Sequence, residues 1–128
     1  IFDPIKNEMF YAEKNNGAYL NNYRVRVSKK NNLDECLFGT NNNNIVKSSF
    51  NTRVMGSASL DLAYVGNGRL DGFFQKNLKI WDIAAGIVIV KEAGGRINHI
   101  DYSKKENINL IASSNNIHEK MLEILINF

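Results

Sequence analysis

A single acidic residue, Asp82, stands at the start of the most apolar helical stretch of the chain. The stretch runs from Asp82 to Ala93 and stops at Gly94-Gly95, which predicts a deeply buried helix with the aspartate at its cap position. A carboxylate there accepts the free N–H groups of the first turn and matches the positive end of the helix dipole. Carboxylate oxygens also bind hard metal ions. Spacing alone favours the capping role and leaves a chemical role open.

Helices and strands that could position this residue alternate from residue 33 onward. The pattern predicts strands at 33–40, 71–74, 96–100 and 108–113, and helices at 57–65, 82–93 and 116–126, with Ser57 as a possible N-cap. Residues 1–27 instead show short apolar pieces separated by Asn and Gly turns, which predicts an antiparallel meander. We therefore expect an α/β chain with two parts, antiparallel strands at 1–28 and an α/β domain at 29–128.

Composition and charge narrow the class of protein. The chain has 128 residues, 44% of them hydrophobic, and a formal net charge of +3 spread among acidic residues, so the sequence does not point to a nucleic-acid surface. The single Cys36 lies in an apolar run, which predicts a buried core residue in a reducing cytoplasm. The longest apolar stretch, Ile83 to Val90, is too short to span a bilayer, so no membrane partner is expected. The Asn41 to Asn44 run is interpreted as a solvated loop.

Three stretches together resemble one known family. Residues 81–86 and 91–95, W-D-I-A-A-G and K-E-A-G-G, closely resemble the W-D-x-A-A-G...E-A-G-G signature of the inositol monophosphatase family. Residues 53–65 and 68–74, R-V-M-G-S-A-S-L-D-L-A-Y-V and G-R-L-D-G-F-F, are similar to its next segments upstream. Residues 2–5, 10–13 and 17–21 resemble its strand hairpins. The resemblance covers nearly the whole chain, in order, and is to the C-terminal portion of the bacterial SuhB-like branch.

This resemblance implies a fold and an activity. The fold is the C-terminal α/β layer of the sugar phosphatase fold, preceded by antiparallel strands left over from the N-terminal sheet. The activity is Mg²⁺-dependent hydrolysis of a small phosphomonoester such as inositol monophosphate, in which metal ions bridge the phosphate and activate a water. The substrate itself is not fixed, because relatives use inositol phosphates, fructose 1,6-bisphosphate and nucleotide-derived phosphates.

The resemblance also assigns roles to individual residues. It implies that Asp82 is a metal ligand and that Gly56, Ser57 and Ala58 face the sugar ring of the substrate, although Ser57 serves equally well as a helix cap. Gln75 stands where family members commonly have a glutamate that binds a substrate hydroxyl. Glutamine keeps the shape but loses the charge, so polyol recognition is weakened or altered, or the residue has no role.

Several family features are absent from the sequence. The D-P-[IL]-D-G-T-x-N-F motif and the G-E-E segment, which supply the other metal carboxylates, do not occur in these residues. Asp3-Pro4-Ile5 is followed by Lys6 and Asn7, so Asp3 is excluded as a ligand. The segment between Thr40 and Arg53 is shorter than the family's and is expected to be rebuilt as a loop. No complete catalytic set is present, and we expect the chain alone to be inactive or very weak.

Two alternatives to an enzyme fragment remain open. One is a non-catalytic regulatory protein, similar to SuhB-like members, that associates with RNA. The other is the product of a split gene. In each case the small number of leftover strands should expose an edge and an apolar face, so self-association or a homodimer is expected.

Overall fold

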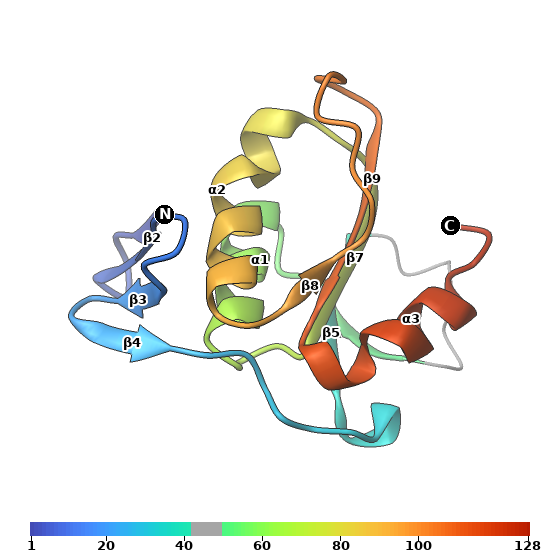
Figure 1. Cartoon of the computed structure of the whole chain (residues 1–128), viewed down its shortest axis with the longest axis horizontal. Helices are drawn as coiled ribbons and strands as arrows, with labels where there is room; N and C mark the ends of the chain where they lie inside the picture. Colours follow the sequence, from blue (N-terminus) through green and yellow to red (C-terminus); the bar gives the residue numbers. More distant parts are fainter. Residues whose placement is uncertain (42–49) are drawn as a thin grey trace.

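The chain is arranged in four layers, seen from left to right in Figure 1. A small antiparallel sheet is followed by a pair of helices, then by a five-stranded mixed sheet, and finally by a C-terminal helix. The computed structural model describes residues 1–41 and 50–128. This α/β layering confirms the expected fold class.

The first layer is the expected antiparallel meander. Its strands pair in chain order, β1-β2-β3-β4, and their bounds are β1 Phe2–Asp3, β2 Glu8–Ala12, β3 Ala18–Leu20 and β4 Tyr23–Val25. Asn7, Asn15 and Asn21 have positive φ angles, and they lie in or beside the turns between these strands. Asparagine tolerates this left-handed conformation better than most residues, so the asparagine-rich sequence suits tight turns.

The second sheet has the order β6-β5-β7-β9-β8. Its strands are β5 Leu37–Gly39, β6 Asn51–Arg53, β7 Gly72–Leu78, β8 Arg96–Ile97 and β9 Ile108–Ser113. β5 runs parallel to both β6 and β7, whereas β9 is antiparallel to β7 and to β8.

Three of these strands differ from the sequence prediction. The strand expected at 33–40 begins as a 3-10 turn at Leu33–Glu35, where the Asn32 side chain caps the Asp34 N–H, so only β5 remains. β7 is longer than predicted and β8 is shorter. β6 was not predicted at all, because the segment before Arg53 was expected to be a loop; apart from Asn41, the Asn41 to Asn44 run lies outside the described residues.

Two helices pack on one face of this sheet and one on the other (Figure 1). The helices are α1 Ala58–Gly66, α2 Ile80–Glu92 and α3 His118–Ile124. Ser57 is the N-cap of α1, as predicted, and its Oγ accepts the Leu60 N–H at 3.3 Å. The last predicted helix is shorter than expected, since its first turn, Asn115–Ile117, is a 3-10 turn.

The start and the burial of α2 both differ from the prediction. Lys79 is the N-cap, and Asp82 is the third residue of the helix rather than its cap. The helix begins early because the Ile80 N–H donates to the Lys105 carbonyl at 2.9 Å, a long-range bond that local sequence does not reveal. The helix is also not buried all round, since Trp81 is 61% exposed and Val88 is 36% exposed.

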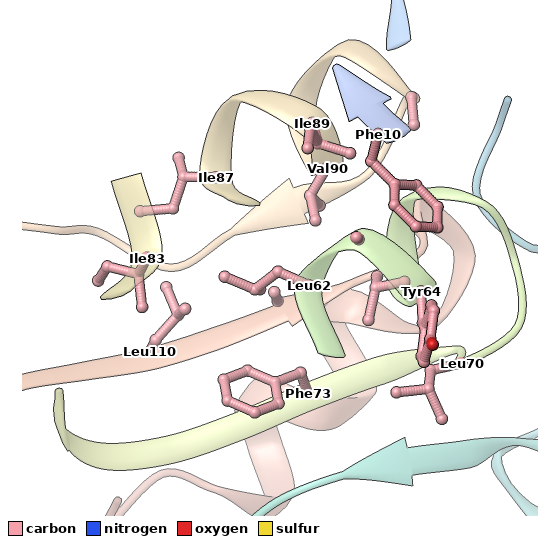
Figure 2. Close-up of a cluster of buried hydrophobic side chains, with 14 of the residues drawn as sticks. Phe10, Leu62, Tyr64, Leu70, Phe73, Ile83, Ile87, Ile89, Val90 and Leu110 are labelled. Atoms are coloured by element: carbon pink, nitrogen blue, oxygen red, sulfur yellow. The ribbon is translucent and has the colours of Figure 1, made fainter. Parts of the chain in front are cut away.

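α1 and α2 cross at unusually short range because glycines lie at the contact. A Cβ added to Gly86 would lie 2.5 Å from the Cβ of Leu62, and one on Gly66 would lie 2.7 Å from Ile89 Cγ2. Side chains from both sheets close the core around this contact, with Phe10 of β2 and Phe73 of β7 fully buried (Figure 2). The absence of side chains at these glycines therefore sets the distance between the helices.

The first prediction concerns Gly86→Ala. In an ordinary helix this change stabilises by about 0.5–1 kcal/mol, because alanine loses less backbone entropy. Here we expect the free energy of unfolding to fall by about 1–3 kcal/mol, since the new methyl group meets Leu62 at its rigid Cβ. Urea unfolding monitored by far-UV circular dichroism measures the change.

A matched background isolates the cause. Leu62→Ala removes most of the opposing side chain, so Gly86→Ala should be neutral or stabilising when it is added to Leu62→Ala. An equal loss of stability in both backgrounds would show that the helix contact does not depend on Gly86.

Candidate functional site

α1 and α2 run side by side in the same direction. Ser59 Oγ donates to the Asp82 carbonyl at 3.0 Å, Leu62 lies against Gly86, and Gly66 lies against Ile89. In each contact the partner lies 23 or 24 residues further along the chain, which requires parallel helices. The two N-termini therefore meet at one end, where free N–H groups and two dipoles create a positive region suited to an anion.

Asp82 lies in the first turn of α2 at this shared end. Its side chain is exposed, and its carboxylate makes no hydrogen bond or ion pair with any described residue. The first-turn position favours the charged carboxylate through the helix dipole. An exposed carboxylate without a protein partner is available to a cation or to another polypeptide.

Gly56, Ser57 and Ala58 form the start of α1 at the same end. Gly56 has a φ of 86°, and no atom lies within 4 Å of the position its Cβ would occupy, so its backbone borders open space. Ser57 Oγ accepts the Leu60 N–H, and Ala58 is partly buried as the first helical residue. The structure thus brings these three residues to the helix end that carries Asp82.

Gln75 lies on β7, on the sheet face that α1 and α2 cover. Side chains alternate along the strand: Phe73 packs in the helix-side core, Phe74 packs in the α3-side core, and Gln75 follows Phe73. The Gln75 Oε1 atom is buried without a hydrogen-bond partner among the described residues. β7 leads directly into α2, so Gln75 lies toward the end of the sheet that carries Asp82, but no hydrogen bond joins the two among the described residues.

The described residues do not by themselves fit a magnesium site. Residues 1–41 and 50–128 contain no group of three or more His, Cys, Asp or Glu side chains close enough to hold a metal ion. Mg²⁺ requires near-octahedral oxygen coordination, which a single carboxylate does not provide. Asp3 is not available either, because its Oδ1 accepts the N–H groups of Ile5 and Lys6 in a turn.

Cys36 is buried, as predicted, and is not suited to nucleophilic chemistry. Its side chain is 2% exposed, and its Sγ donates to the Asn32 carbonyl at 3.3 Å. Burial raises the pKa of the thiol to about 11. The thiolate is therefore scarce near neutral pH.

One titratable residue near the site was missed in the sequence. Asp61 lies on α1, one turn after Ser57; its side chain is fully buried, and neither carboxylate oxygen has a hydrogen-bond partner among the described residues. Burial raises the pKa of this carboxyl to about 6. The available signal was an acidic residue inside the apolar run Leu60-Asp61-Leu62-Ala63, since such a position on a core-facing helix is unusual.

Comparisons with known proteins agree on one family. The model of the inositol monophosphatase family matches residues 1–127. The fructose-1,6-bisphosphatase/inositol-1-monophosphatase of Thermotoga maritima is 39% identical over 98% of this chain and 53% of its own length. The Nus factor SuhB of Escherichia coli K12 is also 39% identical, over 95% of this chain and 52% of its own length.

A solved structure shows the same fold. The inositol monophosphatase from Anabaena superimposes with a TM-score of 0.89 at 27% sequence identity, and the match covers 99% of this chain and 57% of that one. The chain therefore spans about half the length of the relatives it matches. No helix among the described residues is long and apolar enough to cross a membrane.

The second prediction concerns the pH dependence that Asp61 confers. The folded-state pKa of about 6 lies above the usual 3.8, so the folded protein binds this proton more tightly than the unfolded chain. Stability is therefore lost as pH rises from about 4 through 6. Relative to wild type, Asp61→Asn should gain up to about 3 kcal/mol in unfolding free energy between pH 4 and 7.5, measured by urea unfolding.

Two other groups set the controls. Burial lowers the pKa of His118, which adds the opposite slope below pH 6.5, but this contribution is common to both proteins and cancels in the difference. Asp101→Asn removes an exposed aspartate whose pKa is lowered by hydrogen bonds from Ser103, so its difference from wild type should stay flat above pH 4. A flat difference for Asp61→Asn as well would show that Asp61 titrates normally.

Proposed function

The chain belongs to the inositol monophosphatase family, and we propose that it forms the C-terminal half of a Mg²⁺-dependent hydrolase of phosphomonoesters such as inositol monophosphate. One observation carries the proposal. The parallel contact of α1 and α2 brings two helix N-termini to the same end as Asp82, whose exposed carboxylate has no partner among the described residues. An anionic phosphate and a cation are the ligands that such an end would hold together.

Each residue at this end has a role in the proposal. Asp82 would provide one carboxylate ligand to Mg²⁺, and the remaining ligands would come from outside residues 1–128. The first-turn N–H groups of α1, beginning at Ala58, would donate to an oxygen of the substrate. Ser57 holds that turn in place through its cap to Leu60, and Gly56 leaves room for the sugar ring.

Gln75 bears on substrate preference. Its Oε1 is an acceptor that lacks a described partner, which fits a substrate hydroxyl as donor. An amide accepts such a bond without the charge of a carboxylate, so we propose that polyol substrates bind more weakly than in relatives with glutamate at this position. The substrate class remains a sugar phosphate in the cytoplasm.

Residues 1–128 alone should not turn over substrate. The relatives are named inositol-1-monophosphatase or fructose-1,6-bisphosphatase, and this chain covers about half of their length. With one carboxylate at the shared helix end, metal binding would be weak. We therefore propose that activity requires the other half of the family fold.

A second candidate is a non-catalytic role. Four of the similar relatives are named Nus factor SuhB, which makes a regulatory function a reasonable alternative. In that case the chain would bind RNA or a protein partner without needing Asp82. RNA binding that falls with salt and is unchanged in Asp82→Asn would favour it. The split-gene interpretation is decided separately, by finding the missing D-P-x-D-G-T-x-N-F motif in an upstream reading frame that a stop codon separates.

The third prediction tests the proposed phosphatase. This chain would replace the matching half of the Thermotoga maritima relative, so that the remaining half supplies the other carboxylates. The chimera should hydrolyse inositol monophosphate with Mg²⁺. Asp82→Asn in the chimera should lower kcat/KM by at least about 100-fold and weaken Mg²⁺ activation, because one charged ligand is lost.

Asp101→Asn serves as the matched control, because this exposed aspartate lies on the loop between β8 and β9, away from the helix end. It should leave kcat/KM within about twofold. A folded chimera in which Asp82→Asn keeps full activity would reject Asp82 as a ligand.

A further inference from the structure

We propose that the exposed side of α2 and the free edge of the small sheet form a docking surface for one occupant. That occupant is a polypeptide segment that carries carboxylates and supplies the half of the family fold that residues 1–128 do not contain. The position of the surface follows from this structure alone, and only the identity of the carboxylates as metal ligands rests on the proposed function.

The exposed side of α2 is apolar. It is formed by Trp81, Ala84, Ala85 and Val88, and all four are exposed. Two of them are large hydrophobic residues at 61% and 36% exposure. Together they make a continuous stripe along the helix, because their spacing of three and four residues places them on one face. A stripe of this kind marks a contact with another polypeptide.

Two clefts flank this stripe and meet at Val88. One has a volume of about 530 Å³ and lies between α2, the turn at Lys14 and Asn15, and Tyr102. The other, of about 230 Å³, lies between α2, the N-terminal residue Ile1 and β2. The small sheet therefore does not seal against α2, and apolar side chains of an occupant could fill the space on both sides of Val88.

The small sheet is apolar on both faces. Phe10 points into the core and is fully buried, whereas Phe2, Met9 and Tyr11 are 42–48% exposed. Tyr11 also stacks on Tyr19, with ring centroids 5.3 Å apart. A sheet with two apolar faces is typical of one that is buried between layers. β1 is the edge strand of this sheet and is two residues long, so additional strands have a place to pair.

The comparisons and the charges favour a segment of different sequence over a second copy. Relatives extend well beyond the part matched here, since the chain covers only 53–57% of the first relative and of the first solved structure. The chain carries a net charge of +3, and Lys14 and Lys91 line the larger cleft. A second copy would bring the same positive charge and one more Asp82. An acidic segment would match the charge and complete the carboxylate set.

The fourth prediction tests the docking surface by association in trans. The probe is the half of the Thermotoga maritima relative that this chain does not match, prepared as a separate polypeptide. Light scattering should show a 1:1 complex, and calorimetry should give its Kd. Val88→Glu, at the junction of the two clefts, should raise the Kd at least 10-fold, because it places a charge in an apolar contact.

Ile126→Glu is the matched control. Ile126 is an exposed apolar residue, 79% accessible, and lies beyond α3 on the opposite side of the large sheet, so its substitution should leave the Kd unchanged. Circular dichroism of both variants verifies that the fold is intact.

Other outcomes overturn the proposal. A homodimer of residues 1–128 that Val88→Glu dissociates would show that the surface binds a second copy, which is the self-association expected from the sequence. No association with the probe would reject the surface. If the 1:1 complex forms but does not hydrolyse inositol monophosphate with Mg²⁺, the docking proposal stands and the proposed function fails. If the covalent chimera is active but no complex forms in trans, the docking proposal fails alone.

Discussion

The contact between α1 and α2 is the constraint on which the rest of this structure depends. Gly86 faces Leu62 and Gly66 faces Ile89, and a Cβ at either glycine would lie closer than 3 Å to its neighbour. Because the helices are parallel, their dipoles point the same way and their N-termini meet. Parallel dipoles repel, so this packing leaves a concentrated positive end that a carboxylate or a bound anion relieves. The candidate site lies at that end.

The same helix pair explains why one side of the protein is closed and the other is open. Near the C-terminal end of α2, Glu92 accepts the backbone N–H groups of Asn15 and Gly17 and holds the first hairpin in place. Near its N-terminal end, no part of the small sheet covers Trp81 or Ala84. The open end is therefore the end with Asp82. Incomplete packing and an incomplete set of carboxylates occur together, which is what one half of a larger fold would show.

Much of the fold could be predicted from the sequence, because local signals and tertiary contacts agree there. Ser57 as an N-cap, β9 at Ile108–Ser113 and the early antiparallel meander all follow from residue type and period. The predictions failed where a distant group decides the outcome. α2 begins at Ile80 because Lys105 accepts its N–H, and an apolar period cannot show that the cover of a helix lies outside the sequence.

The candidate site was predictable as a set of residues but not as a geometry. The family motifs name Asp82, Gly56 to Ala58 and Gln75, and it is the structure that shows how two glycine contacts align the helices. Asp61 was overlooked since its burial depends on β5 and on the segment around Leu70, which are distant in sequence. An acidic residue in an apolar run is a signal for burial, although it does not say what surrounds the carboxylate.

The most direct test of this account is paramagnetic relaxation of backbone amides by Mn²⁺ in place of Mg²⁺, in the assembled two-half protein. The account predicts strong relaxation in the first turns of both helices, at residues 56–59 and 81–83. It should fall steeply toward Gly66 and Glu92, which lie roughly 12–15 Å further along the helices. Relaxation centred elsewhere, or confined to one of the two helices, would contradict the claim that their shared end holds the metal.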